Sequence, residues 1–573
     1  MSRYLIKEYV PDLPIDYAKE PYGTAYKGLY RQMVEFHGVD REMITFVPED
    51  YFPLHQGVLI FVPAGISAED FVNASQWVEC AKKDSICLVF LTAHKKWGKP
   101  EEEDEFIYKA FNQAFHTTGV IDYDQKYAVG YGDSATFLAR YLAYHSVLLG
   151  GAVLFGPEDI PKSVVTKAKD THRLPIWVVN EKGTETPVLT EYYKKRNLCV
   201  DEHLRNDWAK VYNERMLPVD EDLLTQAASR VWVSEAKNAA QLCKNAAWTE
   251  RAFKDFLIKR YHHDHLSTTQ LKVNFSLEDV GIKVYKKRMP HASFKGLQER
   301  IWSVYAPTDY DKNKAYPLVV VTHGFQCTHD LMVKQTDFWK IAEHRKFIVA
   351  FTQGLPTEGT NYGLPRWRSG GLFPMRGFPR GLFRRPDTLD EFQSEVNYFR
   401  AVVEDVQKRY NIDASRIYCT GHSNGAAMTY GLSMAMGDVF AASAQVGGAC
   451  WQFESLDEMP KDHYRMPALN VSCEHDRWID PFDQSTPLYW ETLWRKVENG
   501  VDPEAEPFIV DNGTTITYIW NNADGIPVVR FAMYRDANHS YHSGIAWYVW
   551  DEFLSGFSKD ADGTRYYGGR PIR

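Results

Sequence analysis

Short, continuous apolar runs alternate with longer amphipathic stretches along the second half of the chain. Each run has the length of one buried strand; the runs are "PLVVVTHG", "FIVAFTQG", "RIYCTG", "ASAQVGG", "ALNVSCEHD" and "VVRFAMYRD". Between them lie segments with helical spacing, such as "DEFQSEVNYFRAVVEDVQKRY". This pattern predicts an α/β fold in which helices cover both faces of a mostly parallel sheet. Polar residues that follow the strands should then meet at one edge of the sheet.

The first half of the chain repeats this plan. The segment "ITFVPEDYFPLHQGVLIFVPAG" at 44–65 resembles "WSVYAPTDYDKNKAYPLVVVTHG" at 302–324, which aligns Gly65 with Gly324, and later blocks match in the same order. We therefore predict tandem α/β domains, a duplication, at residues 1–262 and 263–573. The cluster "YHHDH" at 261–265 contains metal-ligand residue types, but we interpret it as a solvated linker because no partner cluster accompanies it.

Composition and charge narrow the choice of partners. Hydrophobic residues make up 44% of the chain and charged residues 25%, as in ordinary globular proteins, and the net charge of -9 argues against nucleic acid or an anionic membrane surface. The N-terminal residues lack a signal-peptide pattern, and no apolar run approaches the length of about 18 residues that a membrane span needs. The eight cysteines show no C-x-x-C pair. We therefore expect a cytoplasmic protein with reduced thiols and without a cofactor or metal. The sequence is compatible with a monomer or a homo-oligomer.

The strongest chemical motif is G-x-S-x-G at Gly421-His422-Ser423-Asn424-Gly425, between an apolar run and an Ala-rich helical pattern. A sharp strand-turn-helix bend exposes a serine hydroxyl, and the crowding of that bend requires small residues two before and two after it. Ser423 is therefore the predicted nucleophile. The backbone N–H of Asn424 should face the oxyanion, together with that of Phe325 after the strand "VVVTHG".

The chain order Ser, then Asp, then His predicts the other two members of a triad. Asp476 follows the strand "ALNVSCEHD" directly, whereas Asp480 and Asp483 are rivals farther from the strand end. His539 comes first after the strand "VVRFAMYRD" and is the preferred base, and His542 is the alternative.

Together these motifs resemble the polyhydroxybutyrate depolymerase and feruloyl esterase group of α/β-hydrolases. The resemblance covers about residues 300–557 and is carried by "VTHGF", "YNIDASRIYCTGHSNGAAMTYGLSMAMGDVFAASAQVGG", "CEHD" and "DANHSYH". It implies hydrolysis of small or oligomeric acyl esters, of hydroxycinnamoyl or hydroxyacyl type, through Ser423, Asp476 and His539. In one departure, "RWIDPF" follows Asp476, where family members often have Asp-x-x-Val-Pro. The alternatives are a serine peptidase of the same fold and a non-catalytic two-domain binding protein.

The first domain lacks these catalytic residues. Gly132 stands where Ser423 stands, although a shifted register would make Ser134 the nucleophile. Thr184 falls at the acid position, and the segment "VSEAKNAAQLCKNAA", which should carry the base, contains no histidine. Because a serine without an imidazole has no proton acceptor, we predict a non-catalytic hydrolase-like domain.

The second domain also carries an insertion near 361–387 with six arginines between 366 and 385. Its place between the oxyanion loop and the nucleophile strand favours a lid or pocket wall. Aromatic rings and guanidinium groups there would favour esters with an aromatic ring or an acid group; the alternative is that the arginines fasten the two domains together. The residues expected to contact the substrate are His323, Trp367, Arg366, Arg368, Trp451 and Trp478.

Overall fold

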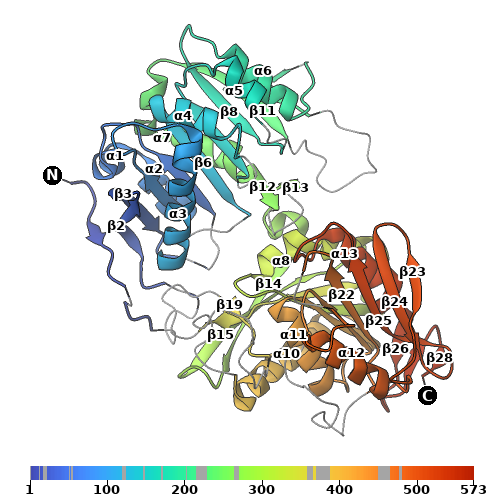
Figure 1. Ribbon diagram of the computed structural model, residues 1–573. Coiled ribbons are helices and arrows are strands. Elements are labelled where there is room, and N and C mark those ends of the chain that lie inside the picture. Colours follow the sequence, from blue (N-terminus) through green and yellow to red (C-terminus); the bar gives the residue numbers. More distant parts are fainter. Residues whose placement is uncertain are drawn as a thin grey trace. The chain divides into compact units, whose positions relative to one another are not determined.

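The chain forms two compact units in a computed structural model (Figure 1). The structure describes residues 2–11, 13–16, 22, 24–50, 52, 56–118, 124–145, 149–168, 172–201, 203–214, 229–263, 270–357, 365–369, 387–449, 465–476 and 480–572. The first unit continues to Ser276, and the second begins at Leu277. The first unit extends beyond 262 because β13 (Gln270–Val273) pairs antiparallel with β12 (Arg260–His263).

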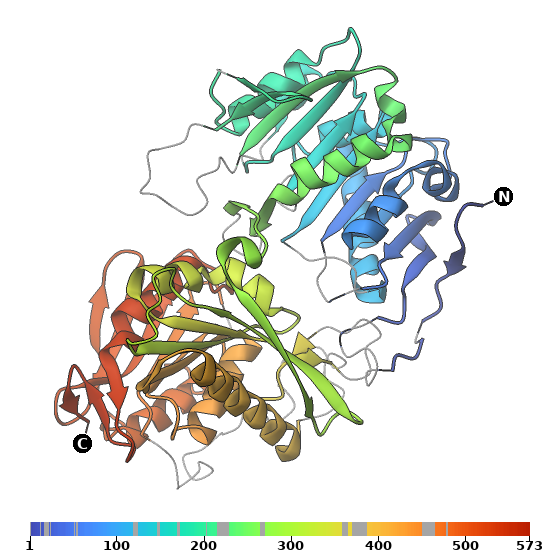
Figure 2. The same cartoon turned by 180° about the vertical axis from the view of Figure 1, so that it is seen from behind.

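A ten-stranded sheet forms the second unit. In spatial order its strands are β14 (Lys283–Pro290), β15 (Leu297–Tyr305), β17 (Ile348–Thr352), β16 (Tyr316–Thr322), β20 (Ile412–His422), β21 (Ala442–Val446), β22 (Ala468–Cys473), β25 (Pro527–Tyr534), β24 (Thr515–Asn521) and β23 (Phe508–Asp511). The strands from β17 to β25 run parallel. At one edge β14 and β15 form a long antiparallel pair (Figure 2), and β24 and β23 are antiparallel at the other.

Helices cover both faces of this sheet. They are α8 (His329–Thr336), α9 (Phe338–Arg345), α10 (Leu389–Arg409), α11 (Asn424–Ala435), α12 (Pro487–Glu498) and α13 (Ser543–Tyr548). Ile417 and Cys419 of β20 join the core formed with α10 and α11. Tyr418 points to the opposite face, because side chains alternate along a strand, and its ring lies 5.9 Å from that of Trp550. The predicted mostly parallel sheet with two helical layers is confirmed.

The first unit repeats this strand order. Its eleven strands are β1 (Ile6–Glu8), β2 (Gly28–Phe36), β3 (Val39–Val47), β5 (Cys87–Leu91), β4 (Gly57–Phe61), β6 (Lys126–Tyr131), β7 (Gly151–Phe155), β8 (Ile176–Glu181), β11 (Arg230–Ala236), β10 (Lys210–Asn213) and β9 (Leu204–Arg205). From β2 to β9 the order and the directions match those from β14 to β23. Its helices are α1 (Ala68–Ala74), α2 (Trp77–Asp84), α3 (Pro100–Thr118), α4 (Asp133–Tyr141), α5 (Lys162–Lys167), α6 (Pro187–Arg196) and α7 (Ala246–Arg251). The fold is therefore a tandem of α/β-hydrolase-like units.

One part of the sequence alignment between the units is shifted by two residues. Phe61 pairs with Gly130 across β4 and β6, and Thr322 pairs with Gly421 across β16 and β20. Gly65 therefore corresponds to Gln326 rather than to Gly324, and both have positive φ, 79° and 60°. The second unit has two additional residues in the connection between β15 and β16. The repeated motifs on either side of this connection do not reveal the difference in length.

The two units also end alike. In the first, α7 continues as a π-helical and a 3-10 turn into β12, and in the second, α13 continues in the same way into β26 (Phe557–Lys559). The Tyr127 hydroxyl donates to the carbonyl of Arg260 at 2.7 Å, and the Tyr418 hydroxyl donates to the carbonyl of Phe557 at 2.6 Å. A buried tyrosine thus ties each central strand to the first residue of the strand that follows the last helical segment of its unit.

Two remaining sequence expectations concern membranes and thiols. Among the described helices, none is long and apolar enough to cross a membrane. Seven cysteines lie in the described ranges; all are free, and all but Cys199 are buried. Cys450 lies outside the described residues. The cytoplasmic location stays a prediction.

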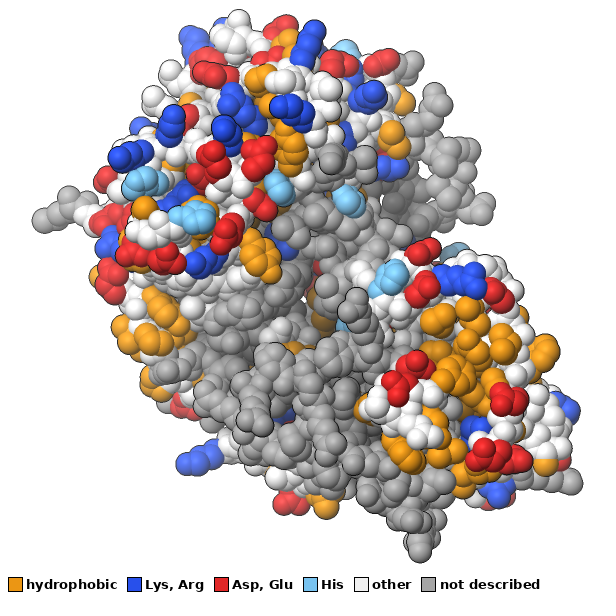
Figure 3. Space-filling view, in the orientation of Figure 1, with side chains coloured by type: hydrophobic (Ala, Val, Ile, Leu, Met, Phe, Trp, Pro, Cys, Tyr) orange, Lys and Arg blue, Asp and Glu red, His pale blue; other side chains and the backbone are white. Residues whose placement is uncertain are grey.

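Hydrophobic side chains gather on the surface around β23 and β24 (Figure 3). Phe508, Ile509 and Val510 on the edge strand β23 are 65%, 55% and 41% exposed. Phe482, 51% exposed, packs at 4.8 Å between ring centres against Tyr518 of β24. This apolar edge contrasts with the charged edge strand β14, whose sequence is "KVYKKRMP".

The two tyrosines provide a matched test of the repeated architecture. Tyr127→Phe should destabilise the first unit and Tyr418→Phe the second, each by about 1–2 kcal/mol, because a buried carbonyl loses its donor. Hydrogen exchange of amides in β12 and β26 reports the free energy of opening for each unit separately. Loss of protection in both units from either single change would contradict this assignment.

Candidate active site

Ser423 lies at a tight junction between β20 and α11. Its φ of 55° and ψ of -116° are strained for a residue with a side chain. A Cβ at Gly421 would collide with Thr322 Oγ1, and one at Gly425 would lie 2.6 Å from the carbonyl oxygen of Thr322. The Thr322 hydroxyl donates to the carbonyl of Gly425 at 2.8 Å. The close approach of the parallel strands β16 and β20 beneath the helix therefore requires glycine at both flanking positions.

The loop after β16 passes beside Ser423. A Cβ added to Gly324 would lie 3.5 Å from Cβ of Ser423. His323 Nδ1 donates to the carbonyl of Gly324 at 2.7 Å, and its Nε2 accepts from the N–H of Gly354 at 2.8 Å. Because a trans peptide directs its C=O and N–H oppositely, this bond turns the N–H of Phe325 away from the imidazole.

His323 was expected to contact the substrate, and the structure corrects this. Its side chain is fully buried, and burial lowers its pKa to about 3. A neutral ring is needed for one nitrogen to donate while the other accepts. His323 therefore braces the oxyanion loop from inside the fold.

Asp476 and His539 meet at the ends of neighbouring parallel strands. His539 Nδ1 lies 2.7 Å from Asp476 Oδ2; the Asp476 side chain is 1% exposed and that of His539 is 27% exposed. A buried carboxylate in this position orients the imidazole and leaves its Nε2 for another partner.

The rival residues make other contacts. Asp480 Oδ1 accepts from the N–H of Phe482, and Asp483 Oδ1 accepts from the N–H of Ser485, so both carboxylates close local turns. His542 Nδ1 accepts from the N–H of Gly544 and caps α13.

The imidazole of His539 reaches the turn that carries Ser423. Its ring centre lies 4.7 Å from that of His422, and a Cβ on Gly447 would lie 3.1 Å from His539 Cε1. In the described structure Ser423 Oγ makes no hydrogen bond to His539. Hydrogen bonds between a nucleophile and its base are often long before the substrate binds, so Ser423 and His539 remain compatible with proton transfer.

Trp367, Arg366 and Arg368 differ from their expected role as substrate contacts. Trp367 is fully buried, and its indole N–H donates to the carbonyl of His323 at 2.9 Å. Arg366 forms an ion pair with Asp387 at 2.6 Å. Arg368 is fully buried and donates to the carbonyl of Leu355 at 3.1 Å. These side chains stabilise the base of the insertion, because each has its polar group committed inside the fold.

Asn424 has a further contact that its predicted oxyanion role did not reveal. Its Oδ1 accepts from the N–H of Trp367 at 2.6 Å, and its Nδ2 donates to the carbonyl of Trp367 at 3.2 Å. The side chain thereby fixes residues 365–369 against the start of α11 while its main chain stays at the turn. Trp451, Trp478 and residues 370–386 of the insertion lie outside the described residues.

The first unit keeps the backbone of this turn without its serine. Gly132 has φ 59° and ψ -119°, nearly the values of Ser423. Ser134 is fully buried and donates to the carbonyl of Phe61 at 2.6 Å, so its hydroxyl is an internal contact. Ala64, the counterpart of Phe325, donates its N–H to the carboxylate of Asp133 at 3.2 Å. The group that would face an oxyanion is thus already occupied.

The acid and base positions of the first unit are also changed. The N–H of Thr184 donates to the carbonyl of Glu181, as the N–H of Asp476 donates to that of Cys473, so Thr184 holds the acid position. Gly156 of the first unit corresponds to Gly447 of the second. A Cβ added to Gly156 would contact Ala240, whereas a Cβ added to Gly447 would contact the ring of His539. A methyl group therefore fills the space of the imidazole.

Comparison with known proteins places these observations in context. No family model matches the chain. A bifunctional acetylxylan esterase/xylanase of Neocallimastix patriciarum is 21% identical over 257 residues, which are 45% of this chain and 33% of that protein. A poly(3-hydroxyalkanoate) depolymerase C of Paucimonas lemoignei is 29% identical over 133 residues, 23% of this chain and 28% of that protein. The solved feruloyl esterase module from Clostridium thermocellum, a mutant complexed with sinapinate, has a TM-score of 0.30 at 13% identity, covering 48% of this chain and 88% of its own.

The chain is similar to the polyhydroxybutyrate depolymerase and feruloyl esterase group of α/β-hydrolases. The resemblance carried by the motif residues is thereby confirmed. The chain spans about a third of the length of these two curated relatives.

Protonation of a buried histidine beside the oxyanion loop should limit the acid stability of the second unit. Burial lowers the pKa of His329 to about 4, below its value of about 6.5 in an unfolded chain. Between these values only the unfolded state gains the proton. The free energy of unfolding therefore falls as pH drops from about 6.5 to about 4, by about 1.4 kcal/mol per pH unit for this residue.

Urea titrations between about pH 7 and about pH 5, followed by pulsed hydrogen exchange in β16, measure this slope for the second unit alone. His329→Asn should make the slope shallower, whereas the exposed His344→Asn should leave it unchanged. An equal slope in all three proteins would refute the assignment.

Proposed function

We propose that this chain is a serine carboxylic ester hydrolase in which Ser423 attacks the acyl carbon. The observation that carries the proposal is the 2.7 Å contact between His539 and the buried Asp476. The ring of His539 lies 4.7 Å from that of His422, the neighbour of Ser423 in its strained turn. The names of the esterase and depolymerase relatives support the same reaction class.

In the proposed reaction His539 Nε2 takes the proton of the Ser423 hydroxyl as its oxygen attacks the ester carbonyl. Asp476 accepts from Nδ1 and stabilises the imidazolium that forms. The N–H groups of Phe325 and Asn424 donate to the oxyanion. The leaving alcohol takes the proton from His539. Water then attacks the acyl carbon while His539 takes a proton from it, and His539 returns that proton to the Ser423 oxygen as the acid leaves.

The proposed substrates are small or oligomeric acyl esters of hydroxycinnamoyl or hydroxyacyl type. The burial of Arg366 and Arg368 gives no support to a preference for esters with an acid group. Matched ester and amide substrates of one acyl group distinguish this proposal from a serine peptidase, because a peptidase would cleave the amide as well as the ester, whereas an esterase would cleave only the ester.

We further propose that the first unit carries out no chemistry. Gly132, Thr184 and Ala240 stand where the second unit has Ser423, Asp476 and the ring of His539. Its Asp133 carboxylate occupies the N–H of Ala64. Among the described residues of this unit, those at the three catalytic positions offer no nucleophile, acid or imidazole, and the main-chain N–H at that turn is already hydrogen-bonded.

Ser423→Ala should lower kcat for an aryl acetate by about 10³-fold or more while the fold is retained, because the covalent step is lost. Ser134→Ala, the control in the first unit, should keep full activity. A fluorophosphonate should label one serine per chain. Two labelled serines, or full activity of Ser423→Ala, would refute the proposal.

Asp476→Asn should reduce kcat by about 10⁴-fold, because an amide at this place favours the wrong tautomer of His539. Asp480→Asn and Asp483→Asn are matched controls on the same loop, and each should retain the parent rate. The measurement is the steady-state hydrolysis of one aryl ester by the purified variants. A large loss in either control and none in Asp476→Asn would transfer the acid role to that residue.

A further inference from the structure

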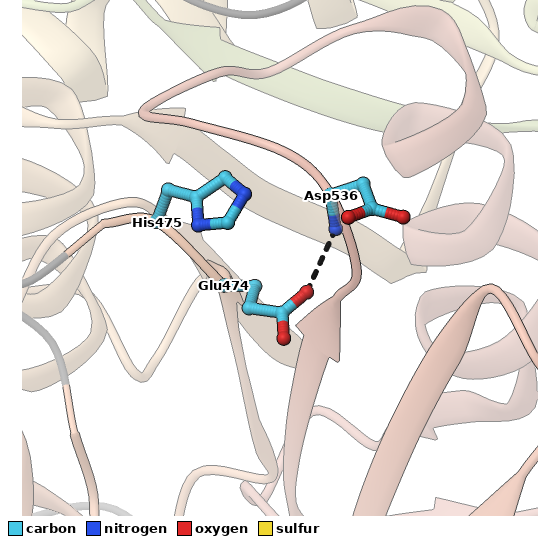
Figure 4. A group of neighbouring side chains, drawn as sticks. All are labelled: Glu474, His475 and Asp536. Atoms are coloured by element: carbon cyan, nitrogen blue, oxygen red, sulfur yellow. Dashed lines mark hydrogen bonds between the residues drawn. The ribbon is translucent and has the colours of Figure 1, made fainter.

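Glu474, His475 and Asp536 lie together at the surface of the second unit, on the two loops that carry Asp476 and His539 (Figure 4). One ligand atom from each side chain lies within 4.8 Å of the other two, and all three residues are exposed. None of these side chains has a part in the proposed reaction. The sequence offered no sign of the group, because 60 residues lie between His475 and Asp536.

Main-chain contacts hold the two loops in this arrangement. The N–H of Glu474 donates to the carbonyl of Tyr534 at 2.8 Å, and the N–H of His475 donates to that of Ala537 at 2.9 Å. The N–H of Asp536 donates to Glu474 Oε2 at 2.9 Å. Figure 4 shows this bonded oxygen on the side of Asp536 and His475, whereas the second carboxylate oxygen of Glu474 points away from them. The ligand atoms that lie near one another are therefore Oε2 of Glu474, the carboxylate of Asp536 and the imidazole of His475.

The first unit has the same loop frame without these ligands. The N–H of Lys182 donates to the carbonyl of Ala236 at 2.9 Å, as Glu474 does to Tyr534, so Lys182 and Gly183 correspond to Glu474 and His475. Asn238 corresponds to Asp536, and both have left-handed backbone, with φ of 53° and 50°. Asparagine therefore satisfies this turn by itself. The charge of Asp536 and the imidazole of His475 are not needed for the backbone, and they occur in the unit that has the Asp476–His539 pair.

Two carboxylates and one imidazole are the donor set of a borderline divalent ion. Zn²⁺ and Co²⁺ take such ligands at about 2.0–2.2 Å, which places donor atoms about 3–4 Å apart around the ion. The limit of 4.8 Å between the three ligand atoms exceeds this range, so rotation of the exposed side chains would bring the donors around one ion. Exposure of the group allows water to complete the coordination, and the ion would offset the repulsion between the two carboxylates.

We propose that Glu474, His475 and Asp536 bind one divalent ion of the zinc class, and that this ion fastens the loop of Asp476 to the loop of His539. The ion would act as a clamp on the backbone of both loops, outside the reaction itself. Because its ligands come from both loops, each loop would gain order only when both contribute.

The test uses Co²⁺ and Zn²⁺ with the full chain. Titration with Co²⁺ should give a visible absorption band that saturates at one ion per chain, and Zn²⁺ should displace it. Asp536→Asn, which places in this turn the residue that the first unit uses, should lower the affinity at least tenfold without changing the fold, and His475→Gln should do the same. His37→Gln is the control, because His37 pairs with the carboxylate of Glu105 at 3.9 Å in the first unit, away from the proposed ligands.

Hydrogen exchange gives a second readout that is independent of catalysis. Zn²⁺ should increase the protection of amides at 474–476 and 535–539 in the parent chain but not in Asp536→Asn. Equal Co²⁺ affinity in the parent and Asp536→Asn, or the absence of saturable binding, would overturn the proposal. Because neither readout uses ester hydrolysis, the metal site can fail while the proposed function stands, and the reverse.

Discussion

The hydroxyl of Thr322 donates to the carbonyl of Gly425 where the parallel strands β16 and β20 meet the start of α11, and the site of the second unit depends on this contact. The close packing of these three elements admits no Cβ at Gly421 or Gly425. It sets the strained backbone of Ser423, brings the loop after β16 alongside, and leaves Asn424 free to hold the base of the insertion. The arrangement of the proposed catalytic groups thus follows from backbone packing.

Much of this arrangement can be predicted from local sequence because its causes are local. A strand, a turn with two glycines and a helix follow one another in the motif around Ser423, and Asp476 and His539 each come just after an apolar run. In a parallel sheet such positions converge at one edge. The repeated strand order is equally accessible, since matching motifs recur along the chain. The two-residue shift beside Gly65 is not, because it lies in a loop where no motif marks the gap.

Side-chain direction is what the sequence leaves undetermined. Trp367 and Arg368 lie in a Gly- and Arg-rich segment typical of an exposed loop, yet both are fully buried. Their polar atoms bond to main-chain carbonyls of distant segments, and such pairs arise only when the chain is folded. His323 is a similar case: a histidine after a strand suggests a functional contact, but desolvation and two main-chain partners make it an internal brace.

Gly132 and Ser423 share one unusual backbone conformation, although only one of them has a hydroxyl to present. The conformation is therefore a property of the strand-to-helix junction that does not require a hydroxyl at this position. A classification of this chain by its Cα trace would assign it two equivalent centres. The two positions differ only in a few side-chain atoms. In proteins of this architecture, a conserved backbone and a conserved activity therefore need separate evidence.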